Sequence, residues 1–285
     1  MRMVVNSQKN EKIENLGSFT VARSFWQALN SANFVELKIR NSRVKAIFLK
    51  EISVFFASIT GYAIMGVFLL VNAVYLWLFP GDNVLSFGFA DMKRFFVDAP
   101  YLFLLLIPAL TMRSLAEEHS LGTLELILTK PVRTMEVIFA KFCAGQVLVF
   151  LSLLPTMGYL VALVQLSSVE SLDWAGIFTS YVGLFLLASV YLAAGIFASA
   201  LTSNQMVALL LGLGFGLLLT EGIPQLVGLG LLEGNAYYIL QLGLSYHYES
   251  ISRGVIDSRD IVYFISLTAL FLLAAKTWIQ KRNWS

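Results

Sequence analysis

The sequence predicts an all-α membrane protein with six transmembrane helices, and two observations lead to this fold class. Hydrophobic residues make up 58% of the 285 positions and charged residues only 13%, with a mean hydropathy of +0.74. A soluble domain usually has about a quarter charged residues, because its surface faces water. The second observation is that the apolar residues gather in six runs, most of them near the roughly 20 residues that a helix needs to cross a bilayer.

The predicted spans follow one another along the chain with polar connections between them. They cover residues 54–79, 95–112, 137–166, 174–201, 205–231 and 261–278. The second span is the weakest, because Asp98 shortens its continuous apolar core to residues 101–112, and we expect Asp98 at the outer interface. Proline and glycine occur inside several spans, which membrane helices tolerate better than soluble ones.

The basic residues predict the orientation. If both termini are cytoplasmic, nine Lys and Arg precede the first span, four lie from Arg113 to Lys141, and three (Lys276, Lys281 and Arg282) lie at the C-terminal end, against four on the outer side. The positive-inside rule therefore predicts that both termini are cytoplasmic, and a bacterial inner membrane is the expected location. The small net charge of +2 argues against a nucleic-acid partner.

Four regions organise the chain. Residues 1–20 are polar and aperiodic and predict a disordered tail. Residues 21–53 mix apolar and basic side chains, which predicts an amphipathic helix in the inner interface; a charged linker is the alternative. Residues 54–279 are predicted to form the six-span domain, with residues 222–259 as an outer re-entrant segment, and residues 280–285 to form a short cytoplasmic tail.

The connection between the second and third spans, residues 113–136, is the most informative stretch. Residues 115–120 predict a polar helix, Gly122 a break, and residues 124–129 a short amphipathic turn that Pro131 ends, with Ser120 or Thr123 as its N-cap. Leucine and isoleucine share one face of this stretch, and its glutamates, Glu117, Glu118 and Glu125, are expected to stay accessible. Such a helix either docks into a groove on a soluble partner or packs on the protein's own surface.

Signals for catalysis are weak. A phosphate-binding loop that ends in Lys-Ser or Lys-Thr does not occur, and Cys143 and the two histidines form no metal-binding pattern. Gly212 and Gly216 have the GxxxG spacing that allows close packing of helices. Glu221 is predicted near the outer boundary, and His247 is interpreted as a structural hydrogen-bonding residue.

The segment MRSLAEEHSLGTLELILTKPV resembles the cytoplasmic signature of ABC-2-type permeases, which is close to R-x-x-A-E-E-x-x-x-G-T-L-E-L-L-L-T-x-P. The matching positions are Arg113, Ala116, Glu117, Glu118, Gly122, Thr123, Leu124, Glu125, Leu126, Leu128, Thr129 and Pro131. Residues 49–70, 95–113, 198–208 and 247–264 are similar to one branch, the gliding-motility-associated permeases of the GldF type. The 48 residues before them exceed what that branch leads us to expect.

This resemblance implies a type V exporter-like permease that forms a homodimer or a heterodimer with a second membrane subunit. It implies that residues 117–131 form a coupling helix that contacts a cytoplasmic ATPase, and that ATP and Mg²⁺ bind to that partner chain, since this chain is not an enzyme. It also implies an auxiliary Gld-type membrane protein as a possible partner. Export or gliding motility is the expected process.

Two other functions are compatible with six spans. A secondary transporter or channel would place polar or charged residues near the bilayer midplane, where this sequence has few. A scaffold that anchors a motility or secretion machine without transporting anything would share the same fold. The chains that co-purify with the protein distinguish these functions.

Overall fold

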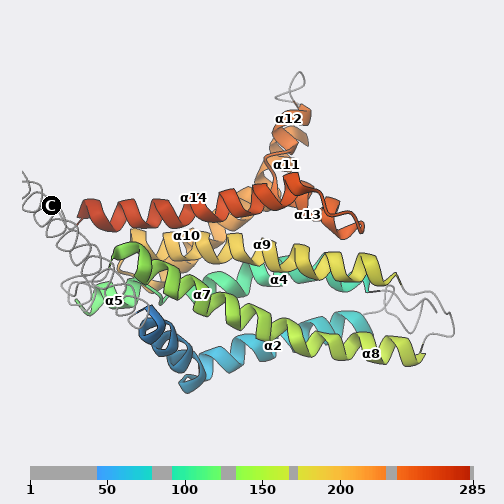
Figure 1. Ribbon diagram of the computed structural model, residues 1–285, viewed down its shortest axis with the longest axis horizontal. Helices are drawn as coiled ribbons and strands as arrows, with labels where there is room; N and C mark the ends of the chain where they lie inside the picture. The colour runs from blue at the N-terminus through green and yellow to red at the C-terminus, as the bar shows by residue number, and fades with distance from the viewer. Residues whose placement is uncertain (1–43, 79–91, 123–132, 167–172, 229–235, 283–285) are drawn as a thin grey trace, which may run out of the picture. The chain divides into compact units, whose positions relative to one another are not determined.

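A computed structural model of the protein describes residues 44–78, 92–122, 133–166, 173–228 and 236–282 (Figure 1). The chain forms two compact units, Met1–Ala46 and Ile47–Ser285. Of the first unit only residues 44–46 are described, and the labelled helices all belong to the second unit. Regular structure in the described ranges is helical throughout, with no strand, which confirms the predicted all-α class.

Residues 47–57 are helical and precede the labelled helices. The longer helices are α2 (Ile59–Trp77), α4 (Lys93–Thr111), α7 (Thr134–Leu153), α8 (Met157–Leu166), α9 (Trp174–Leu201), α10 (Gln205–Leu217) and α14 (Ser258–Arg282). Between and after them lie the short elements α5 (Ala116–Ser120), the 3₁₀ turn η1 (Leu154–Thr156), the π-helical turn η2 (Leu218–Gly222), α11 (Ile223–Gly228), α12 (Ala236–Leu240) and α13 (Leu244–Ser252).

Six described helical stretches are long and apolar enough to cross a membrane, which confirms the six predicted spans. They are Ile59–Trp77, Lys93–Ser120, Thr134–Gln165, Trp174–Leu201, Gln205–Gly228 and Ser258–Lys281. The third combines α7, η1 and α8, which continue into one another around Pro155.

The first span begins later than predicted, at Ile59 instead of residue 54. The helix over residues 47–57 stops at Ser58, whose backbone is extended (φ −100°, ψ 141°). The chain turns so tightly there that a Cβ on Gly61 would lie 2.6 Å from the Phe55 carbonyl oxygen. The apolar run from residue 54 therefore contains two helices, because composition alone does not reveal a break in backbone direction.

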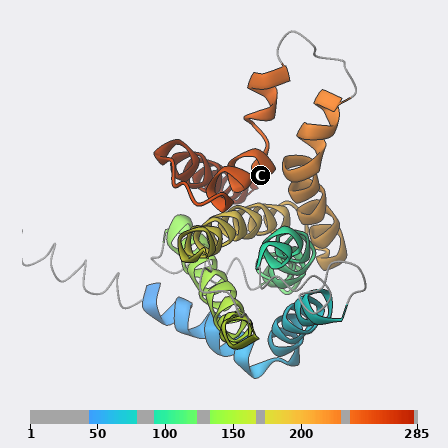
Figure 2. The same ribbon diagram turned by 90° about the vertical axis from the view of Figure 1, so that its right-hand side faces the viewer.

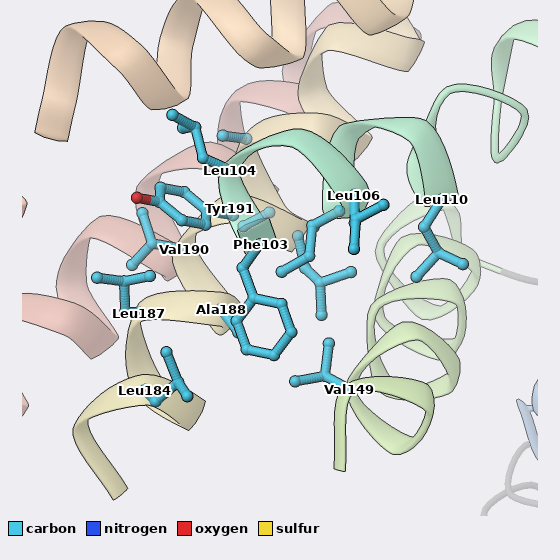
Figure 3. Close-up of a cluster of buried hydrophobic side chains, with 14 of the residues drawn as sticks. Phe103, Leu104, Leu106, Leu110, Val149, Leu184, Leu187, Ala188, Val190 and Tyr191 are labelled. Carbon is cyan, nitrogen blue, oxygen red and sulfur yellow. The ribbon is translucent and has the colours of Figure 1, made fainter. Parts of the chain in front are cut away.

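The central helices of the bundle are α9 and α4, whose spans are the most buried of the six. Small residues such as Ala188 and Ala194 line α9 and let α4, α7, α10, α13 and α14 pack against it. Viewed along the bundle, α4 and α9 lie near its centre (Figure 2). Their side chains interlock in the core with Val149 of α7 (Figure 3).

Glycines bring α10 close to these central helices. A Cβ on Gly212 would lie 3.1 Å from the Pro108 Cβ and 3.6 Å from the Gly195 Cα, and one on Gly216 would overlap Leu104 Cδ1. Both glycines of the GxxxG pair thus face neighbours within the same chain. Close approach of helix backbones is what small residues permit in membrane bundles.

The stretch of residues 222–259 contains α11, α12 and α13, each too short to span a bilayer. His247 of α13 connects this stretch to the last span: its Nδ1 lies 2.7 Å from Asp260 Oδ1 and its Nε2 2.7 Å from the Gln241 carbonyl oxygen. The Tyr248 hydroxyl donates a 2.7 Å hydrogen bond to the Phe96 carbonyl, and burial raises the pKa of this phenol. His247 is therefore a structural hydrogen-bonding residue, as the sequence predicted.

Candidate functional site

The connection between α4 and α7 holds the residues that the sequence analysis singled out. Arg113, Glu117, Glu118 and Gly122 are described, at the end of the bundle where α4 stops and α7 begins (Figure 1). The remaining predicted coupling residues, Thr123, Leu124, Glu125, Leu128 and Pro131, lie outside the described residues, as does the predicted turn over residues 124–129.

A single serine of α9 holds the start of this connection. The backbone N–H groups of Leu115 and Ala116 each donate a 2.9 Å hydrogen bond to Ser199 Oγ, and the Ser199 hydroxyl donates to the Met112 carbonyl at 3.2 Å. A hydroxyl offers one donor and two acceptor positions, so the three bonds use its full capacity. Leu115, Ala116 and Ser199 are all buried. The first turn of α5 is thus fixed to the most buried helix of the bundle.

Glu118 of α5 lies in an ion-pair cluster. Lys141 Nζ of α7 lies 3.0 Å from Glu118 Oε1 and 2.8 Å from Glu51 Oε1, and Lys50 Nζ lies 3.5 Å from the same Glu118 oxygen. The Lys141 side chain is only 3% exposed, and those of Glu51 and Glu118 are 12% and 13% exposed. The expectation that Glu118 stays accessible is wrong, because the buried ammonium group of Lys141 draws the carboxylate inward.

The other described residues on and beside α5 leave a more open surface. Arg113 is exposed, Glu117 is half-buried, and the apolar residue Leu121 is 68% exposed. Ser120 is the last residue of α5, and its hydroxyl donates to the Glu117 carbonyl at 2.9 Å. The turn that it was predicted to cap lies outside the described residues. Thr123, the other candidate cap, lies outside the described residues.

Gly122 ends α5 with a backbone conformation that favours glycine. Its φ is +66°, its N–H donates to the His119 carbonyl at 3.1 Å, and a Cβ there would meet no atom within 4 Å. The glycine is therefore required by the left-handed backbone and not by crowding. The break predicted at this position is confirmed.

The far end of the connection is also fixed. α7 begins at Thr134, and the Glu136 carboxylate accepts a 3.3 Å hydrogen bond from the backbone N–H of Arg133. A carboxylate in the first turn is favourable at the positive end of a helix dipole. The connection of residues 113–136 therefore leaves and re-enters the bundle at helix ends whose backbone groups have partners.

The sequence analysis missed Ser199, Lys141 and Glu51. Ser199 sits in an apolar run and gives no signal of its own. Lys141 had a signal, since it falls within the predicted third span, where a lysine needs a partner. The described parts of the chain contain no group of three or more His, Cys, Asp or Glu side chains that could hold a metal ion.

Comparison with known proteins identifies a family to which this chain is similar. The family model described as "ABC-2 family transporter protein" matches residues 6–255, which is most of the chain. A search of curated proteins finds no match.

Proposed function

Because the chain belongs to the ABC-2 family of transporter proteins, we propose that it is the membrane permease subunit of an ABC transporter and that residues 113–136 receive mechanical work from a separate ATPase chain. The observation that carries the proposal is the attachment of α5 to α9 through Ser199. Because these hydrogen bonds are direct, a displacement of α5 would also displace α9, the most buried helix of the bundle.

The charges and exposed groups around α5 suit a protein partner. Arg113 and Glu117 offer polar contacts and Leu121 an apolar one. A ligand shifts a two-state element only by its differential affinity for the two states. In this proposal the ATPase changes shape with bound ATP and Mg²⁺, and the changed contact with residues 117–131 favours one arrangement of the helices over the other.

The placement in the cell follows from the bias of basic residues. The α5 end of the bundle, together with both termini, would face the cytoplasm of a bacterial inner membrane. Residues 21–53, as an interfacial helix, would lie against the anionic headgroups on the same side. The permease would pair with a second copy or with another membrane subunit.

The finer assignment is that the chain belongs to a GldF-type system. The similar stretches at residues 49–70, 95–113, 198–208 and 247–264 support it. An auxiliary Gld-type membrane protein would then be a further partner, and the work done would be export or movement of the gliding machinery. A non-transporting anchor of such a machine is the competing proposal.

Co-purification distinguishes these functions. Tagged protein in a mild detergent should bring down a stoichiometric ABC ATPase chain. Recovery of motility or secretion components without nucleotide hydrolysis would support the anchor, and recovery of no ATPase would contradict the permease proposal.

Replacing Gly122 by proline tests the coupling role. Proline fixes φ near −65° and lacks the N–H that Gly122 donates to His119, so α5 must end differently. Gly254 is a matched control, because it also has positive φ (+92°) and its N–H donates to Ile251 at 3.1 Å, but it follows α13. Gly122→Pro should insert normally yet lose the dependence of ATP hydrolysis on the permease, whereas Gly254→Pro should keep it. Equal loss in both would refute the assignment.

A further inference from the structure

Lys141 joins three helices that are distant in sequence. Its ammonium group contacts Glu118 of α5 and Glu51 of the helix over residues 47–57, and its own backbone belongs to α7. Lys50 lies 4.0 Å from Glu51 and 3.5 Å from Glu118 on the exposed side. Among the described residues of this cluster, two lysines therefore face two carboxylates.

The cluster fixes geometry more than it adds stability. A buried ion pair costs a large desolvation free energy that its attraction only partly offsets, but removing one partner leaves an uncompensated buried charge. Once formed, such a cluster strongly disfavours separation of its members. α5 is thus held at two places, by Ser199 of α9 at its first turn and by Lys141 at Glu118.

The helix over residues 47–57 is separate from the first span. The chain changes direction at Ser58, where the Ser58 hydroxyl lies 2.8 Å from Thr60 Oγ1 and donates to the Phe55 carbonyl at 3.2 Å. The α-helix does not continue through this point, so residues 47–57 and α2 are two helices joined at a turn. Within the described residues, this helix contacts the α5 end through the Glu51–Lys141–Glu118 cluster and through Lys50.

We propose that Lys141 is a positioning residue that transmits displacement of α5 to the helix over residues 47–57, so that this helix moves with the coupling connection while α2 stays in the bundle. The inference rests on the proposed function of α5. It extends the moving part of the permease beyond residues 113–136 to a segment that precedes the first span.

Two fluorescent reporters separate this inference from the proposed function. In a Cys143→Ala background, an environment-sensitive dye is attached to Ser120→Cys, which is exposed at the end of α5, or to Val54→Cys, which is 53% exposed on the 47–57 helix. The permease is assembled with its co-purified ATPase in nanodiscs. A non-hydrolysable ATP analogue should change both signals. Failure of the Ser120 signal to change would count against the coupling role of α5 itself.

Lys141→Met should abolish most of the Val54 response and leave the Ser120 response in place. Glu51→Gln keeps the Lys141–Glu118 pair, so it should give the same loss with a milder effect on folding. Lys50→Met is the matched control, because Lys50 meets the same carboxylates but its side chain is 56% exposed, and both responses should survive.

The exchange Glu118→Lys with Lys141→Glu restores an opposite-charge pair between α5 and α7 but places a carboxylate of α7 against Glu51, so it should not recover the Val54 response. If Lys141 only stabilised the fold, its substitution would lower the melting temperature and affect the fluorescence responses at positions 54 and 120 alike. The inference is overturned if the dye at position 54 does not respond in the protein that keeps Glu51 and Lys141. It is also overturned if, in Glu51→Gln or Lys141→Met, the dyes at positions 54 and 120 both still respond.

Discussion

Ser199→Ala should loosen the attachment of α5 to α9. The substitution removes the acceptor of two buried N–H groups, those of Leu115 and Ala116. Each buried donor left without a partner costs about 1–3 kcal/mol, so the two together cost at least about 2 kcal/mol. Since 1.4 kcal/mol is a factor of ten, the opened form of this turn should become about 30-fold more populated or more. The lost donation to the Met112 carbonyl adds to this effect.

Hydrogen exchange followed by mass spectrometry measures this opening directly. Peptides that cover residues 113–122 should exchange faster in Ser199→Ala by about the same factor, since exchange reports the free energy of local opening. Ser189→Ala is the control, because Ser189 lies on the same helix and its hydroxyl only donates back to the Phe185 carbonyl at 2.8 Å. Its loss leaves no N–H unpaired. Unchanged exchange of residues 113–122 in Ser199→Ala would refute the idea that this hydroxyl fixes α5.

Two further predictions concern the packing of the bundle. Gly216→Ala places a methyl group against Leu104 Cδ1, so it should cost about 1–3 kcal/mol for overpacking, whereas Gly214→Ala, which meets nothing within 4 Å, should be neutral or stabilise by up to about 1 kcal/mol through helix propensity. Melting in detergent compares the two, and equal melting temperatures would contradict the contact. His247→Leu should destabilise the α13–α14 connection by stranding the buried Asp260 carboxylate, and adding Asp260→Asn should relieve part of that cost. Additive losses of melting temperature in this double-mutant cycle would show that the two side chains do not interact.

The proposed orientation and the proposed ATPase partner both rest on the sequence pattern. The bias of basic residues toward one side and the match at Arg113, Glu117 and Gly122 support a coupling connection in the cytoplasm. The geometry of α5 supplies the reason why such a connection would transmit force, since its first turn is bonded to α9. The two lines of support are independent, because neither uses the observation behind the other.

The number and order of the spans could be read from the amino-acid sequence, because each span is a local property of about 20 consecutive apolar residues. The break at Gly122 was equally local, since a glycine between a polar helix and an apolar run favours a left-handed backbone. The start of the first span could not be predicted from the local sequence, because the chain bends at Ser58 within an unbroken apolar run.

What only the tertiary structure decided is which polar groups meet. From the sequence, Lys141 was interpreted only as a basic residue on the inner side and Glu118 as an accessible contact. Ser199 was interpreted only as part of an apolar helix. Lys141 is 90 positions from Glu51, and Ser199 is 84 from Leu115, so no periodicity connects them. Apolar runs specify that helices enter the membrane, whereas the partners of buried charges and N–H groups depend on how those helices pack.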